Sequence, residues 1–308
     1  AACPPAKVED GSSGRGRNGR SPAALSGTLL KQSCPAGPLS RQFRQLIPSD
    51  SVMQSGQFRV LHWNILAQAL TGAEGGSHFD RVEPGVTSWE RRRWYLLREL
   101  LRFQPGYPGL LSGEAALSLP LLSWKLWTGR HRILYNTHRF ECLQSETGLL
   151  IEPNEDGTEF LDAPQRRRLS TTAAASCGLQ PRISKAKVTF SNLRLLQTKA
   201  LITALKERVP ANSPLLLCGD FNGESFEPFY NVIVQSGLDI ASAYKQPEEP
   251  PFTTFLNTGI DYIWYRRLRP LALLEIPPRD SVESNGLPCA AFPSDHFCLS
   301  VDFCFCKN

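Results

Sequence analysis

The stretch LLLCGDFN, from Leu215 to Asn222, joins an apolar run to a polar ending. The apolar run predicts a buried strand. On an extended chain, residues two positions apart face the same side, so Asp220 and Asn222 are expected to project together while Phe221 points into a core. A carboxylate beside a carboxamide at the end of a buried strand indicates a functional site. The same residues also suit an Asx-type turn after a strand, and both interpretations stand at this point.

Strands and helices alternate outward from this stretch. A helix is predicted to begin after Ser88, an N-cap residue, and to end at Gln104-Pro105, because the residue before a proline avoids the α region. A second helix is predicted over residues 192–209, where apolar residues recur at helical spacing. Further strands are predicted at residues 58–66, 260–265 and 297–305. This alternation of helices and strands indicates an α/β fold.

Polar residues that could carry out chemistry lie at the ends of these predicted strands. They are Asn64, Asp220 and Asn222, Asp261 before Tyr-Ile-Trp-Tyr, and Asp295-His296 before Phe-Cys-Leu-Ser-Val. Active sites of open α/β sheets collect at strand ends. We therefore expect these residues to converge, although the sequence separates them widely.

The residue types point to one kind of chemistry. Two or three carboxylates with a carboxamide make a hard-oxygen site suited to Mg²⁺. A histidine beside a carboxylate can act as a base or as a hydrogen-bond donor to a transition state. Each residue alone also has a structural explanation: Asp261 as a solvated strand-edge residue, Asp295 as part of a turn and His296 as a half-buried histidine. Together the groups suit attack on a phosphate ester, and they predict phosphoester hydrolysis.

Four motifs occur in an order that is typical of one superfamily. WNILAQAL (63–70), CGDFN (218–222), DYIWY (261–265) and PSDHF (293–297) resemble the endonuclease/exonuclease/phosphatase superfamily. Within it they are similar to the branch of nocturnin and the carbon catabolite repressor type deadenylases. The resemblance implies a two-sheet α/β sandwich over residues 57–306 and Mg²⁺-dependent hydrolysis.

The resemblance also implies roles for the matching positions. Asp220 would orient the nucleophilic water, and Asn222 would stabilise the phosphorane-like transition state. His296 would contact the scissile phosphate and would be oriented by Asp261.

A metal site is implied as well, with Asn64 and Asp295 in the inner or outer shell of Mg²⁺. The principal Mg²⁺ ligand of the family is a glutamate in a Leu-Gln-Glu strand after the first helix. This chain reads GYPGLLSGEAALSL there, and Glu114 is in neither that context nor that spacing. Ile183 stands where the family has the histidine of a Thr-His-Leu motif.

Both departures fall in residues 106–132 and 149–184, which show no convincing helix or strand pattern. One interpretation is a gene-model or splicing fault that removed or replaced core segments, and the other is a pseudoenzyme that lost its metal ligand. Without that ligand the transition state is expected to lose several kcal/mol of stabilisation, on the order of a thousandfold in rate.

Three functions are compatible with this resemblance. The first is a nocturnin-like, Mg²⁺-dependent phosphohydrolase that acts on the 2′-phosphate of NADP(H). The second is a 3′-5′ exoribonuclease that acts on the poly(A) tail of mRNA. The third is a catalytically inactive paralogue that binds RNA or protein partners.

Residues 1–56 are rich in Gly, Ser, Pro and Arg and lack sustained periodicity, so a disordered basic leader is expected there. The only methionine is Met53, and the true start is expected to lie upstream. The net charge of +5 is compatible with a polyanionic substrate. The basic clusters Arg91–Arg93, Arg166–Arg168 and Arg266/Arg267/Arg269 could contact phosphates, but they are interpreted as solvated faces.

Cysteine content and hydropathy indicate the compartment. The nine cysteines form no CxxC pair, so we expect a reducing compartment without structural disulfides. The most apolar window, residues 110–127, is interrupted by charged residues and proline, and no membrane span is expected. A cytoplasmic location is therefore expected, or a mitochondrial one if the true N-terminus is a transit peptide.

Overall fold

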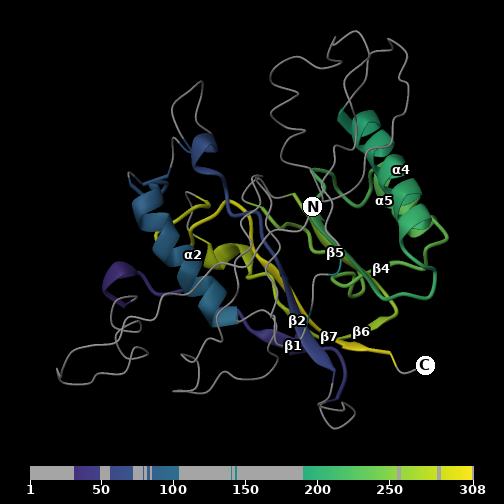
Figure 1. The fold of residues 1–308 in the computed structure, drawn as a ribbon. Helices are drawn as coiled ribbons and strands as arrows, with labels where there is room; N and C mark the ends of the chain where they lie inside the picture. Colours follow the sequence, from purple (N-terminus) through teal and green to yellow (C-terminus); the bar gives the residue numbers. More distant parts are fainter. Residues whose placement is uncertain are drawn as a thin grey trace, which may run out of the picture.

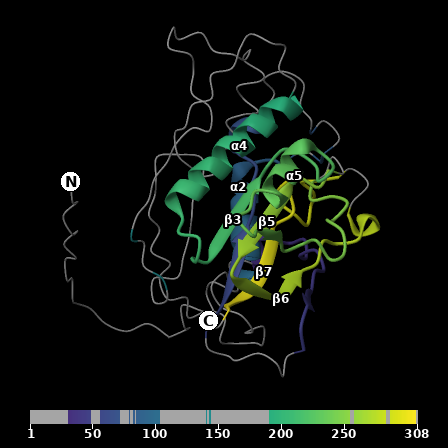
Figure 2. The same ribbon diagram turned by 90° about the vertical axis from the view of Figure 1, so that its right-hand side faces the viewer.

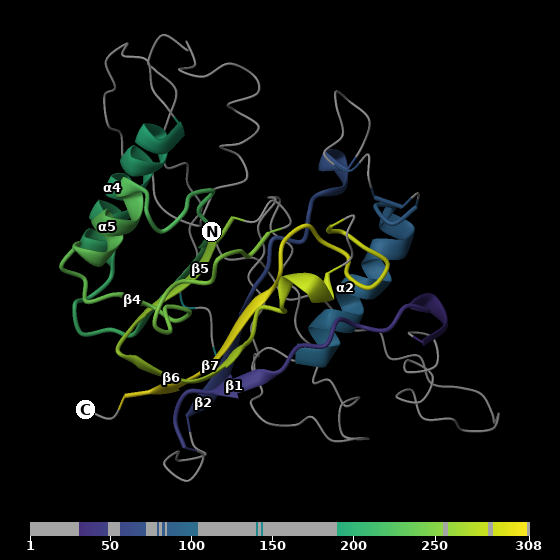
Figure 3. The same cartoon turned by 180° about the vertical axis from the view of Figure 1, so that it is seen from behind.

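In a computed structural model of the chain, the structure describes residues 31–48, 56–71, 85–103, 190–254, 258–282 and 286–306, with the single positions 79, 82, 83, 140 and 143. These residues form a mixed α/β sandwich around two antiparallel sheets (Figure 1). Helix α2 lies on one side of the strands, and α4 and α5 lie on the other (Figure 1, Figure 3). The predicted two-sheet α/β sandwich is confirmed.

The first sheet has the strand order β1-β6-β7-β2. Its strands are β1 (Phe43–Gln45), β6 (Leu268–Leu274), β7 (Leu299–Phe305) and β2 (Gln57–His62). Alternate residues of β7 face the second sheet, where Leu299, Val301 and Phe303 are fully buried. The predicted strand at residues 58–66 is too long, because the chain leaves the ladder after His62 and the carbonyls of the next loop bond to a side chain instead.

The second sheet has the strand order β3-β5-β4. Its strands are β3 (Leu215–Asp220), β5 (Asp261–Arg266) and β4 (Ala241–Ser242). Leu217, Tyr262 and Trp264 face the helices, whereas Cys218 and Ile263 face the first sheet. Both faces of this sheet are therefore covered, and its polar ends are held in a rigid frame.

The helices cover the outer faces of the two sheets. They are α2 (Trp89–Phe103), α4 (Phe190–Arg208) and α5 (Pro228–Val234), with short 3₁₀ turns η2 (Gln68–Leu70) and η4 (Arg279–Ser281). Ser88 caps α2 as predicted, because its Oγ accepts the Arg91 backbone N–H at 3.4 Å. Leu201 of α4 and Phe229 of α5 pack on the second sheet, and Figure 2 shows both helices in front of its strands.

The C-terminal end of α2 is attached to the first sheet. Arg59 of β2 forms two hydrogen bonds to Asp302 of β7, Nε to Oδ1 at 2.6 Å and Nη2 to Oδ2 at 2.7 Å. Its remaining nitrogen, Nη1, donates to the backbone carbonyl of Phe103 at 2.9 Å. Phe103 itself packs against Leu274 and Cys298. One buried ion pair thus joins two strands and satisfies a carbonyl at the end of the helix.

The predicted disordered leader is wrong for part of residues 1–56. Residues 43–45 form β1, which pairs with β6, and the buried Arg41 donates to the carbonyls of Glu275 at 2.9 Å and Cys298 at 2.8 Å. A three-residue edge strand has too few positions to show a periodic pattern. Residues 1–30, 49–55, 106–132 and 149–184 lie outside the described residues, so the predictions made for them stay predictions.

The described helices and cysteines can be compared with two further expectations. Within the described ranges, no helix combines the length and the apolar character needed to cross a membrane. The described cysteines are Cys34, Cys218, Cys289, Cys298, Cys304 and Cys306, and all of them are free thiols.

Candidate active site

The two central carboxylates come from neighbouring antiparallel strands. Asp220 is the last residue of β3 and Asp261 is the first residue of β5, and they lie directly opposite each other. In an antiparallel pair the end of one strand meets the start of the next at one sheet edge. Both residues are buried, with relative exposures of 9% and 2%. The expected convergence occurs for this pair, although the strands are antiparallel and not part of an open parallel sheet.

The stretch LLLCGDFN forms a strand that is followed by an Asx-type turn, so each of its two interpretations is partly correct. Phe221 is buried in the core below α4 and α5, as predicted. The strand ends at Asp220, however, and Asn222 adopts a φ of 50°, a left-handed conformation that Asn tolerates. Its backbone N–H donates to Asp220 Oδ1 at 2.9 Å, which forms an Asx-type turn. The prediction that Asp220 and Asn222 share one face of an extended strand is therefore wrong.

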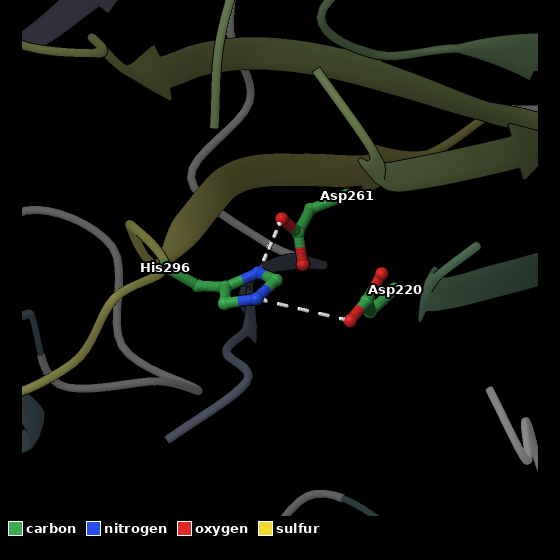
Figure 4. A group of neighbouring side chains, drawn as sticks. All are labelled: Asp220, Asp261 and His296. Carbon is green, nitrogen blue, oxygen red and sulfur yellow. Dashed lines mark hydrogen bonds and ion pairs between the residues drawn. The ribbon is translucent and has the colours of Figure 1, made fainter. Parts of the chain in front are cut away.

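His296 lies between the two carboxylates (Figure 4). Its Nδ1 is 2.9 Å from Asp261 Oδ2, and its Nε2 is 3.9 Å from Asp220 Oδ2. Asp261 can only accept when it is ionised, so the Nδ1 of His296 carries a proton. The other nitrogen, Nε2, then faces Asp220 and is the atom that can meet a substrate.

Asn64 completes the contacts of Asp220. Its Nδ2 donates to Asp220 Oδ2 at 3.0 Å and lies 3.4 Å from His296 Nε2. Its Oδ1 accepts the backbone N–H of Leu66 at 3.2 Å, which fixes the orientation of the amide. The structure therefore brings Asn64, predicted from its place after a strand, into contact with the central pair.

The loop that carries Asp295 and His296 is attached to the loop that carries Asn64. Ser294 Oγ donates to the backbone carbonyl of Asn64 at 2.6 Å and accepts the backbone N–H of His296 at 3.3 Å. The indole Nε1 of Trp63 donates to the His296 carbonyl at 2.8 Å. Asp295 is the next residue after Ser294, and its Oδ1 is 3.4 Å from the Ser294 hydroxyl. Asn64, Asp220, Asp261, Asp295 and His296 are thus tied together by hydrogen bonds, directly or through Ser294.

A buried arginine of α2 connects the same two loops. Arg92 is 1% exposed, and its Nε donates to the Pro293 carbonyl at 2.7 Å. Its Nη2 donates to the carbonyls of Ile65 and Leu66, and its Nη1 donates to Gln68 Oε1 at 3.2 Å. Both site loops are therefore held by one guanidinium, whose planar fork can serve several acceptors at once.

The interpretation of the basic clusters as solvated faces is wrong for two arginines. Arg92 is buried, and Arg266 is only 3% exposed. Arg266 donates to the carbonyls of Ser213 at 3.1 Å and Pro210 at 2.9 Å, at the entry to β3. The sequence does not show which arginines of such clusters are buried and which are solvated, because the acceptors are carbonyls of distant loops.

The charges of the three central groups depend on one another. Burial raises the pKa of Asp220 to about 6, and the charge of Asp261 adds to this increase. Burial also acts to raise the pKa of Asp261, but the charge and hydrogen bond of His296 outweigh it and hold that pKa well below its usual range. Burial acts to lower the pKa of His296, but Asp261 and then Asp220 raise it to about 10. The result is an imidazolium beside an ionised Asp261, with Asp220 close to its own titration at neutral pH.

Two further residues hold Asp261 and were not predicted. Thr253 Oγ1 donates to Asp261 Oδ2 at 2.7 Å, and His62 Nε2 is 3.2 Å from Asp261 Oδ1. His62 is two positions before Asn64, so the alternation rule could have found it. Thr253 lies in a loop with no local pattern, and no signal in the sequence identifies it.

The donor types present fit a divalent cation. The side-chain atoms of Asp220, Asp261 and His296 lie within 4.8 Å of one another. Both oxygens of Asp261 already accept hydrogen bonds, which makes it an orienting group and a poor ligand. Burial raises the pKa of Asp295, as it does that of Asp220, so a nearby cation would favour the ionised form of both. Oxygen donors of Asn64 and Asp295 are the kind that Mg²⁺ takes.

The two predicted departures from the family pattern lie outside the described part of the chain. Glu114 and Ile183 belong to residues that the structure does not describe. The expectation that the principal metal ligand is absent therefore stays a prediction.

A two-sheet sandwich with carboxylates, an amide and an imidazole at one sheet edge defines a class of protein, the phosphohydrolases of the endonuclease/exonuclease/phosphatase superfamily. No protein-family model matches the chain. Its sequence is 30% identical to nocturnin from Xenopus laevis in an alignment of 304 positions that covers 87% of this chain and 77% of that protein. It spans between 65% and 68% of the rat, mouse and human nocturnins.

Solved structures agree with this similarity. The human nocturnin catalytic domain with a bound sulfate anion superimposes with a TM-score of 0.53 at 25% identity, over 87% of this chain and 97% of that domain. ANGEL2, a 2′,3′-cyclic phosphatase, gives a TM-score of 0.57 at 18% identity, over 87% of this chain and 99% of the other, and shows the fold alone. The chain belongs to the nocturnin family.

Proposed function

We propose that the protein is a Mg²⁺-dependent phosphatase that removes the 2′-phosphate of NADP(H). The observation that carries the proposal is the convergence of Asn64, Asp220, Asp261 and His296 at one sheet edge, from four segments far apart in the sequence. Independent turns and half-buried residues would have no reason to form one connected group.

Each group at this edge has a role that its contacts suggest. Asp220, with a pKa near 6, can orient a water and accept its proton at neutral pH. The water oxygen forms a bond to phosphorus, the bond between phosphorus and the ribose 2′-oxygen breaks, and the 2′-oxygen leaves as a hydroxyl by taking a proton from solvent. His296 donates from Nε2 to a phosphate oxygen, while Asp261 holds its Nδ1 at 2.9 Å. Asn222 would add a side-chain donor to the transition state.

Asn64 and Asp295 are the residues that would hold Mg²⁺, together with waters. When bound, the ion would neutralise charge on the phosphate and polarise its oxygens. Asp220 and His296 would remain available for the water and the phosphate.

Two arginines of the described residues are unavailable to a polynucleotide. Arg92 and Arg266 are buried and donate to backbone carbonyls, whereas Arg93, Arg267 and Arg269 of the same clusters are exposed. The solved human nocturnin domain carries a bound sulfate anion. A tetrahedral anion of that size is compatible with a single phosphate group as the reacting part of the substrate.

The test is incubation of the purified chain with Mg²⁺ and either NADPH or 5′-labelled oligo(A), beside an Asp220→Ala control. Phosphate release from NADPH that is lost in the control and on addition of EDTA supports the proposal. Nucleotide release from oligo(A) alone would assign a deadenylase. Equal product in both proteins would overturn the enzymatic proposal, and a titration with NADPH would then test whether the protein binds the dinucleotide without turnover.

A further inference from the structure

Asp261 is held through both of its oxygens by groups from three different segments. Oδ2 accepts from His296 Nδ1 at 2.9 Å and from Thr253 Oγ1 at 2.7 Å. Oδ1 faces His62 Nε2 at 3.2 Å. His296 and Asp261 belong to the proposed chemistry, whereas His62 contacts only the far oxygen of the carboxylate. His62 is therefore placed to act on the reacting groups through Asp261.

The strand β2 places His62 at this position. His62 is the last residue of β2 and pairs with Leu299 of β7. Alternation directs it and Asn64 to one side, while Trp63 packs on the other side against Phe292. The His62 side chain is 16% exposed and the Asp261 side chain is fully buried. The contact between this nearly buried imidazole and the buried carboxylate is therefore part of the packed interior and not a chance contact of two surface side chains.

A second contact on the carboxylate limits its rotation. The torsion that turns an aspartate carboxylate about its Cβ–Cγ bond is broad and nearly two-fold, so packing alone does not fix it. Both other donors to Asp261 act on Oδ2. A donor on Oδ1 fixes the plane of the group and keeps Oδ2 directed at His296 Nδ1. The position of His296 Nε2, 3.9 Å from Asp220, depends on that contact.

We propose that His62 is a positioning residue for catalysis, which donates from Nε2 to Asp261 Oδ1 and thereby holds His296 in its working orientation. The proposal rests on the proposed phosphatase function, in which His296 meets the phosphate. His62 itself touches neither substrate nor water in this scheme. Its removal should therefore slow turnover without weakening substrate binding.

Three variants distinguish the effect of the hydrogen-bond donor of His62 from the effect of its ring. His62→Phe keeps a ring of similar size without a donor, His62→Leu removes both, and His62→Gln keeps an N–H donor on an uncharged side chain. With NADPH as substrate, the first two are expected to lower kcat about tenfold at unchanged KM, a typical cost of losing a supporting hydrogen bond at an active site. His62→Gln is expected to stay close to wild type.

A second readout does not need turnover. The Nδ1 proton of His296, which bonds to Asp261, is followed in proton NMR spectra of ¹⁵N-histidine-labelled protein and assigned by its absence in His296→Asn. His62→Phe and His62→Leu are expected to shift or broaden this signal, and His62→Gln is expected to retain it. Thermal unfolding identifies any variant that fails to fold.

The outcomes are distinct. An unchanged Nδ1 signal in the folded variants without the donor would overturn the positioning role, and so would a raised KM at unchanged kcat, which would make His62 a substrate contact. If the wild-type chain releases no phosphate, the proposed function fails, and the NMR signal still decides whether His62 holds the Asp261–His296 pair.

Discussion

The two halves of the site are held in different ways. Asp220 and Asp261 lie on neighbouring strands and are placed by the backbone ladder between β3 and β5. Asn64, Asp295 and His296 lie on loops and are placed by side-chain hydrogen bonds from other segments. The strand half depends on the sheet, in which many backbone hydrogen bonds act together. The loop half depends on a few side chains, each of which can be removed by one substitution.

This difference predicts how substitutions separate chemistry from stability. Changes to the strand carboxylates are expected to remove activity and leave the fold intact. Changes to the side chains that attach the loops are expected to lower both. Substitutions at four positions test this separation, and they are given in order of decreasing expected effect.

The largest effect is expected for Asp220→Asn. The amide keeps an acceptor for the Asn222 backbone N–H but cannot take a proton from water. A loss of about a thousandfold in kcat is expected, within the range for removing a general base, together with an unfolding midpoint close to wild type. Phosphate release from NADPH and thermal unfolding measure the two quantities. Activity within tenfold of wild type would assign the water-orienting role to another residue.

Arg92→Met is expected to affect both quantities. It leaves the buried carbonyls of Leu66 and Pro293 and the partly exposed carbonyl of Ile65 without the Arg92 donor, at a cost of about 3 kcal/mol in the free energy of unfolding. Because both site loops are released, kcat is expected to fall as well. The matched control is Arg93→Met, which changes an exposed arginine of the same helix. Equal urea midpoints for the two variants would contradict the role of Arg92 between the loops.

Substitutions of Asn222 distinguish a role in the turn from a role in catalysis. Asn222→Gly accepts the φ of 50° without strain, whereas Asn222→Ala is strained by about 1 kcal/mol. If the side chain stabilises the transition state, kcat falls about a hundredfold in both variants and stability falls only in the alanine variant. Full activity of Asn222→Gly would limit this residue to the Asx-type turn.

The smallest effect is expected for Trp63→Phe. This change removes the hydrogen bond from the indole to the His296 carbonyl and keeps most of the aromatic packing. The expected loss is about 1 kcal/mol in the free energy of unfolding, the typical worth of one such bond. Trp89→Phe, at a 42% exposed position of α2, serves as the control. A loss no larger than in the control would show that the loop is held without the indole.

The same difference explains which parts were predictable from sequence. The runs that become β3, β5 and β7 and the helices α2 and α4 show strong local patterns, and the polar residues at their ends marked the site. Strand β6 was missed because Pro270 interrupts it at a bulge, and proline argues against a strand. Arg92 was misinterpreted because its acceptor, the Pro293 carbonyl, is 201 positions away. Local patterns predict what a strand carries, and contacts between distant loops have no local signature.

The attachment of α2 through Arg59 has a consequence for how this family can diverge. The Phe103 carbonyl at the end of the helix is satisfied by a residue of β2, and Asp302 of β7 orients that residue. Among the described residues, the end of the helix is thus completed by the two-sheet sandwich. The predicted departures from the family pattern come after Phe103 in the sequence. Because the sandwich itself satisfies the end of the helix, the half-site at the sheet edge is expected to keep its geometry when the segments that follow Phe103 change.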